Sequence, residues 1–196
     1  MLDLQPAADQ VGSLVAGITD DQLDDPTPNA GRTVSALLAH LHGLSIAFTD
    51  AAKKVANPIT STSPNQGQLV LDPNWRTSIP QALAGLAAAW REATAWHGMT
   101  MAGGIEMTGE ECGAVASNEL VIHGWDLAAA TRQPFSVAEA NLQASYEFCS
   151  AVPDDAAARE GLFGPVVQVP DDAPLLARTL GYAGRDPAWT PKSEVP

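Results

Sequence analysis

A helical repeat of apolar residues after position 33 constrains the fold more than any other feature of the sequence. The apolar residues follow the i, i+3, i+4, i+7 spacing of a buried helical stripe: Val34, Leu37, Leu38, Leu41, Leu44 and Phe48. Thr33 stands where a helix N-cap is expected, and the helix should run to about Val55. Such a stripe must be buried against other elements, so the spacing predicts a helix inside a larger helical assembly.

The rest of the chain reads as further helices joined by mixed loops. Helices are expected over about Pro6 to Ile18, Trp75 or Ile79 to Trp96, Glu110 to Thr131, Val137 to Val152 and Pro174 to Tyr182. The segment from Met99 to Gly109 should be a short extended excursion, and residues 57–74 a long loop. We therefore predict an all-α fold, a four-helix bundle with additional short C-terminal helices, forming a single domain over residues 1–196.

The predicted helix over residues 110–131 carries apolar side chains on all sides, at Leu120, Val121, Ile122 and Trp125. A helix without a polar face is expected to be the most buried one of the set. Trp125 is therefore interpreted as a core residue.

Composition excludes several classes of partner. The net charge of −13 repels nucleic-acid phosphates and anionic membranes, so no nucleic-acid or membrane partner is expected. No apolar run approaches the roughly 20 residues that span a bilayer, and no signal peptide is visible, so a cytoplasmic location is expected. The two cysteines, Cys112 and Cys149, form no disulfide framework and are expected to be buried.

Glu119 and His123 carry the chemistry of the predicted helix over residues 110–131. Residues four apart on a helix differ by only about 40° in azimuth, so both side chains leave from one face. Ala116, Leu120 and Leu127 share that face, which should point inward. A buried carboxylate needs compensation. A metal ion would supply it, but a Glu–His ion pair or a hydrogen-bonded core histidine remains the alternative.

His40 is the natural third ligand, because it lies among the apolar stripe of the helix that starts at Val34. His42 is about 200° away around the same helix and should face solvent or another interface. His97 is interpreted as a helix C-terminal capping residue. Two histidines and one carboxylate leave positions of an ion open, as catalytic rather than structural sites do.

Two neighbours of the pair have open interpretations. Asp126, about 60° around the helix from His123, could orient a metal-binding imidazole by accepting a hydrogen bond from it, or form a structural hydrogen bond or salt bridge. Cys112 lies about 10 Å along the helix from Glu119, too far to share an ion with it.

Two stretches of the sequence resemble a known family. Residues 33–41, which hold His40, and residues 119–127, which hold Glu119 and His123, resemble the metal-binding domain of mycothiol-dependent maleylpyruvate isomerases and the related actinobacterial DinB-like proteins. The tail is similar to that subgroup too, including the run Gly-Arg-Asp-Pro at positions 184–187.

The resemblance implies a DinB-like bundle in which His40, Glu119 and His123 hold one divalent ion, with mycothiol or another small thiol as cosubstrate. Zn²⁺ is the default ion, and Ni²⁺ or Fe²⁺ also suit the donors. The sequence departs from the family at Arg32, where a tryptophan is usual, and is too short for the isomerases' further C-terminal domain. The resemblance therefore implies the metal site but not the isomerase activity.

Three hypotheses for the function remain open. The first is a metal-dependent enzyme, a small-thiol transferase or isomerase, in which the ion lowers the pKa of the thiol. The second is a non-catalytic protein that binds a metal and a ligand in the same cavity. The third is a helical interaction module with a purely structural Glu–His pair. A small-molecule substrate or thiol is the expected partner, and a homodimer is left open.

Overall fold

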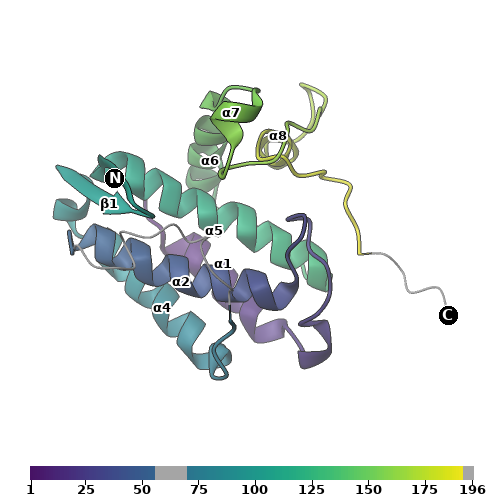
Figure 1. Ribbon diagram of the computed structural model, residues 1–196, viewed down its shortest axis with the longest axis horizontal. Coiled ribbons are helices and arrows are strands. Elements are labelled where there is room, and N and C mark those ends of the chain that lie inside the picture. The colour runs from purple at the N-terminus through teal and green to yellow at the C-terminus, as the bar shows by residue number, and fades with distance from the viewer. Residues whose placement is uncertain (56–69, 192–196) are drawn as a thin grey trace.

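The computed structural model describes residues 1–55 and 70–191. Its core is a bundle of four helices: α1 (Gln5–Gly17), α2 (Val34–Ala52), α4 (Trp75–Trp90) and α5 (Gly109–Thr131). Helices α1 and α2 each pack against both α4 and α5, which closes the ring of four (Figure 1). The predicted all-α bundle is confirmed. Within the described residues, no helix has both the length and the apolar character needed to cross a bilayer.

The apolar repeat of the sequence forms the face of α2 that points into the bundle. Val34, Leu37, Leu38 and Leu41 have no exposed surface. The helix begins as predicted at Thr33, whose side-chain oxygen accepts a hydrogen bond from the backbone N–H of Ala36 at 3.3 Å. The start of α2 is thus fixed by its cap and its rotation by its apolar residues.

A small antiparallel hairpin interrupts the helices, in the segment predicted to be extended. Strand β1 (Met99–Ala102) pairs with β2 (Ile105–Thr108), with Met99 opposite Thr108. The turn between them consists of Gly103 and Gly104, both with positive φ angles. The hydroxyl of Thr100 donates to the carbonyl of Ala51 at 2.6 Å, which ties the hairpin to the end of α2.

Helix α5 lies between the other three bundle helices and a C-terminal layer (Figure 1). That layer comprises α6 (Glu139–Ala151), α7 (Ala156–Arg159) and α8 (Leu175–Tyr182). One side of α5 packs in the bundle core, and Val121, Ile122 and Trp125 pack with Cys149 and Leu180 of the C-terminal layer. The prediction of a helix buried on all sides is confirmed, and so is the core role of Trp125. The short helix α7 was not predicted.

The third predicted helix was too long at its C-terminus. Helix α4 ends at Trp90, and residues 93–96 form a separate 3₁₀ helix, η2 (Ala93–Trp96). The indole N–H of Trp96 donates to the carbonyl of Trp90 at 2.8 Å, a group that a longer α-helix would use for its own backbone. His97 is consequently the exposed C-cap residue of η2 rather than of α4.

Two other connections complete the fold. The acidic stretch after α1 contains a short 3₁₀ helix, η1 (Asp20–Gln22). The predicted long loop over residues 57–74 falls largely outside the described residues, which resume at position 70.

Candidate metal centre

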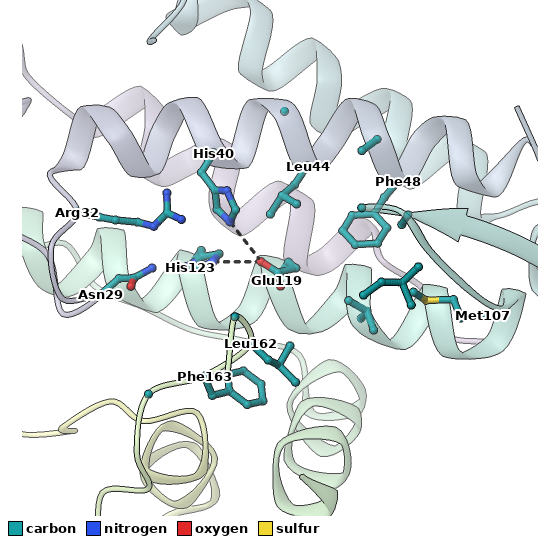
Figure 2. A pocket seen from close by; sticks show the side chains of 18 of the residues that line it. Asn29, Arg32, His40, Leu44, Phe48, Met107, Glu119, His123, Leu162 and Phe163 are labelled. Carbon is teal, nitrogen blue, oxygen red and sulfur yellow. Dashed lines mark ion pairs between the residues drawn. The ribbon is translucent and has the colours of Figure 1, made fainter. Parts of the chain in front are cut away.

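Helices α2 and α5 bring the three predicted ligands together at their contact. One potential ligand atom from each of His40, Glu119 and His123 lies within 4.8 Å of the others. Glu119 Oε2 is 3.1 Å from Nε2 of His123 and 3.8 Å from Nε2 of His40 (Figure 2). The two imidazole rings stand nearly perpendicular, with their centroids 5.1 Å apart. The azimuths predicted for both helices therefore agree with the observed geometry.

Asp126 contacts the imidazole of His123 on the side away from Glu119. Its Nδ1 lies 2.9 Å from Oδ2 of Asp126, on the opposite side of the ring from Glu119. Asp126 is fully buried and also accepts two hydrogen bonds from Arg185, one to each carboxylate oxygen, at 3.1 and 3.0 Å. The sequence left a contact to the imidazole and a salt bridge as alternatives, and the structure contains both.

Burial and mutual charge shift the pKa values in different directions. Burial raises the pKa of Glu119, but His123 and then His40 outweigh it and hold this pKa well below its ordinary value. Burial lowers the pKa of His40, and Glu119 offsets this only in part. Burial also lowers the pKa of His123, but contacts with Asp126 and Glu119 outweigh it, so the net shift is upward. The carboxylate of Glu119 is thus ionised, and the imidazole of His40 favours its neutral form, which can bind a metal.

The donor set fits a divalent cation. Glu119 Oε2 is buried and accepts no hydrogen bond within the described residues, and Nδ1 of His40 also lacks one there. A buried carboxylate oxygen without a hydrogen bond is costly, and a cation held between it and two imidazole nitrogens would compensate that cost. Two nitrogens and one oxygen suit Zn²⁺, and also Ni²⁺ or Fe²⁺.

The cluster lines a cavity of about 540 Å³. Around the cluster the wall is polar, with Asn29 and Arg32 (Figure 2). Arg185 also lines this part of the cavity. Farther along α2 and α5 the wall is apolar, with side chains from both helices and from the hairpin: Leu44, Ala47, Phe48, Ala102, Ile105, Met107 and Val115. Residues 161–164 of the C-terminal layer close another side. The cavity is thus polar at the candidate metal centre and apolar beyond it.

The other sequence candidates lie away from this centre. His42 is half-buried and does not line the cavity, and His97 is exposed on η2. Cys112 is fully buried in the bundle core, and Cys149 donates from Sγ to the side-chain oxygen of Asn118 at 3.2 Å. Burial raises the pKa of both thiols to about 12, so neither cysteine is a nucleophile at neutral pH.

Sequence reasoning missed three contributions to the cavity: Arg185, the segment 161–164, and the position of Arg32 in the wall. The tail run at positions 184–187 was noted as similar to the subgroup, but spacing alone gave Arg185 no role. Arg32 was singled out only because a tryptophan is usual there.

Comparisons with known proteins agree with the resemblance seen in the sequence. Two solved structures share the fold: the mycothiol-dependent maleylpyruvate isomerase, at 17% identity, and a histidine-to-alanine mutant of it, at 15%. Each aligns with a TM-score of 0.54 over 74% of this chain and 66% of its own length. At these identities the likeness shows the fold alone, and the chain spans just under two thirds of those proteins.

Comparison of the sequence with protein families gives a match that covers most of the four-helix bundle. No curated protein sequence matches the chain. The family model described as the mycothiol maleylpyruvate isomerase N-terminal domain matches residues 4–128, which hold α1, α2, α4, most of α5 and the three candidate ligands. Because this match covers well over half of the sequence, the chain belongs to the mycothiol maleylpyruvate isomerase N-terminal domain family.

Proposed function

We propose that the protein is a metal-dependent enzyme that uses a small thiol, mycothiol or a close relative, in a transferase or isomerase reaction. The observation that carries this proposal is the convergence of His40, Glu119 and His123 on the wall of a cavity large enough for a small molecule. These three residues would hold the ion, with Asp126 behind His123. Because α6 and α8 continue the packing around α5, we infer that residues 1–196 form one domain.

Three protein ligands would leave room at the ion for one more ligand, and all three residues line the cavity. A bound ion such as Zn²⁺ would lower the pKa of a coordinated thiol toward neutrality. The protein's own cysteines cannot supply this thiol, because both are buried away from the cavity. A reducing, cytoplasmic location, expected from the sequence, suits a thiol-dependent activity.

The cavity wall suggests how an electrophile would be placed relative to the thiol. Arg32 lies in the wall of the polar end, where its positive charge favours an anionic group on the substrate. Leu44, Phe48 and Met107 would bury a less polar part of the same molecule. Such a molecule would lie beside the thiol, in reach of attack by its sulfur.

The metal site is tested first, with ligand variants and a control on the same helix. We expect His40→Ala, Glu119→Ala and His123→Ala each to abolish stoichiometric metal, measured by elemental analysis of protein purified without added metal. His42→Ala should retain the metal, because its side chain leaves α2 on another face. Loss of metal in His42→Ala with retention in His40→Ala would contradict the proposed site.

The thiol is tested by calorimetry in two buffers of different ionisation enthalpy. The metal-loaded protein should bind mycothiol with release of about one proton per site, because coordination favours the thiolate. Glu119→Ala should lose both binding and proton release. Tight thiol binding to the metal-free protein without proton release would refute the proposal. Turnover of an electrophile with the thiol then separates an enzyme from a non-catalytic binding protein.

A further inference from the structure

A buried chain of contacts connects the C-terminal layer to His123. Arg185 bonds both carboxylate oxygens of Asp126, and Asp126 in turn contacts Nδ1 of His123 at 2.9 Å. None of the three side chains is more than one tenth exposed. Charge-assisted contacts of this length in a dry environment hold a defined geometry.

The chemistry of this chain determines which ring nitrogen carries the proton. Arg185 can only donate hydrogen bonds, and an ionised carboxylate can only accept them. Nδ1 of His123 must therefore carry a hydrogen and donate it to Asp126. The other nitrogen, Nε2, is thereby directed at Glu119 and the cavity.

The backbone around Arg185 is itself fixed, so the guanidinium is not a loosely placed surface group. Gly184 has a φ of +73°, and a Cβ there would come within 2.8 Å of the backbone of Gly164. Arg185 donates from its backbone N–H to the carbonyl of Leu180 at 2.8 Å and from Nη1 to the carbonyl of Ala183 at 2.9 Å. The Gly184 turn and these hydrogen bonds therefore hold the guanidinium of Arg185 at a fixed position against α5.

Arg159 holds the chain that leads to Arg185 in place through two hydrogen bonds. Its Nε donates to the carbonyl of Gly164 at 2.7 Å, and its Nη2 donates to the carbonyl of Tyr182. Residues 161–164, which follow Arg159 directly, form part of the cavity wall. The segment from Arg159 to Arg185 lies beyond residue 128, where the family match ends, yet it contacts the candidate centre.

We propose that Arg185 is a positioning residue of the candidate centre: through Asp126 it fixes the orientation and tautomer of His123, so that the C-terminal layer completes a site whose ligands all lie in the bundle. The contact that orients His123 lies wholly within the protein. The consequence for metal affinity rests on the proposed function.

The test compares four variants: Arg185→Met, Arg185→Lys, Asp126→Asn and the double variant Asp126→Asn/Arg185→Met. Arg178→Met is the matched control, since Arg178 lies in α8 of the same layer but stacks on Tyr146 of α6, with 4.9 Å between its guanidinium carbon and the ring centroid. Circular dichroism establishes that each variant is folded. The double variant leaves no unpaired buried charge, so we expect it to fold even if Arg185→Met alone does not. It can then be used to measure the effect of removing Arg185.

The first readout is the His123 imidazole in nitrogen–proton NMR spectra of the metal-free protein. The wild type and Arg178→Met should show a slowly exchanging Nδ1–H resonance, assigned by its absence in His123→Ala. Arg185→Met and the double variant should lose or broaden it, and Arg185→Lys should restore it in part. An unchanged Nδ1–H resonance in folded Arg185→Met or in the double variant would overturn the proposal.

The second readout is the affinity for Co²⁺, followed by its visible absorption. We expect a loss of roughly 10- to 100-fold in Arg185→Met, as for other residues that support a metal ligand. Removing Arg185 should weaken affinity no further once Asp126→Asn is present, because both act through one contact. Additive losses would refute action through Asp126. If the wild type binds no Co²⁺, the proposed function fails, while the NMR comparison still decides the role of Arg185.

Discussion

Replacing Gly113 with alanine tests how tightly the bundle is packed near the N-terminus of α5. A Cβ at this position would come within 2.5 and 2.7 Å of two ring carbons of Trp96 and within 2.9 Å of one of Trp90. Carbon atoms pack best at about 3.5–4.0 Å, so neighbouring groups would have to move by about 1 Å.

The two tryptophans cannot move freely. Trp90 donates its indole N–H to the carbonyl of Phe48 at 3.1 Å, and Trp96 donates to the carbonyl of Trp90 at 2.8 Å. Their rings also pack edge to face, 5.1 Å apart. Overpacking of this kind costs about 1–3 kcal/mol, and the better helix propensity of alanine returns up to about 1 kcal/mol. With the full return from helix propensity, the expected net loss in the free energy of unfolding is about 0–2 kcal/mol.

Gly85→Ala is the matched control, because Gly85 lies exposed in α4 and a Cβ there would meet nothing within 4 Å. It should raise the free energy of unfolding by about 0.5–1 kcal/mol through helix propensity alone. Urea unfolding measures both variants, and a shift of the midpoint without a change in slope identifies a stability effect. Equal stabilisation by the two alanines would refute the close packing of Gly113 against the tryptophans.

Three further outcomes are expected. Chelation should lower the melting temperature of the metal-loaded protein but leave the bundle folded. The protein should lose about 4 kcal/mol of stability if the free metal concentration before chelation was a thousand times the dissociation constant. Complete unfolding in chelator would show that the site is structural. Cys112 and Cys149, with pKa values raised to about 12 by burial, should resist iodoacetamide at pH 8 until urea unfolds the chain, and rapid labelling of the folded protein in mass spectra would contradict their burial. Thr108→Ala should cost about 1 kcal/mol in urea unfolding, because Thr108 and Glu111 cap the start of α5 reciprocally, and an unchanged midpoint would exclude that contribution.

The features that sequence reasoning predicted depend on neighbours along one helix. The apolar repeat of α2 determines which face is buried, and this places His40 toward the core and His42 on another face. The four-residue spacing of Glu119 and His123 places both on one face of α5 in any helical context. The bundle and the convergence of these side chains could therefore be predicted without knowing how the helices cross.

The features that were missed depend on contacts between distant parts of the chain. The early end of α4 follows from an indole N–H that takes a helix carbonyl, and no local propensity reveals that bond. Arg185 reaches Asp126 across 59 positions, so neither spacing nor periodicity connects them. The apolar end of the cavity arises where two helices and the hairpin meet, and it too is a product of tertiary packing.

The contact between Arg185 and Asp126 has a consequence for the order of folding. Helices α1, α2, α4 and α5 can associate through their own apolar faces, while Arg185 must wait for α8 and the turn after it to dock. The three candidate ligands would then be gathered early, with the ring of His123 still free to rotate. We expect the capacity to capture a metal tightly to lag behind helix formation during refolding, so that the last segment to dock completes the site.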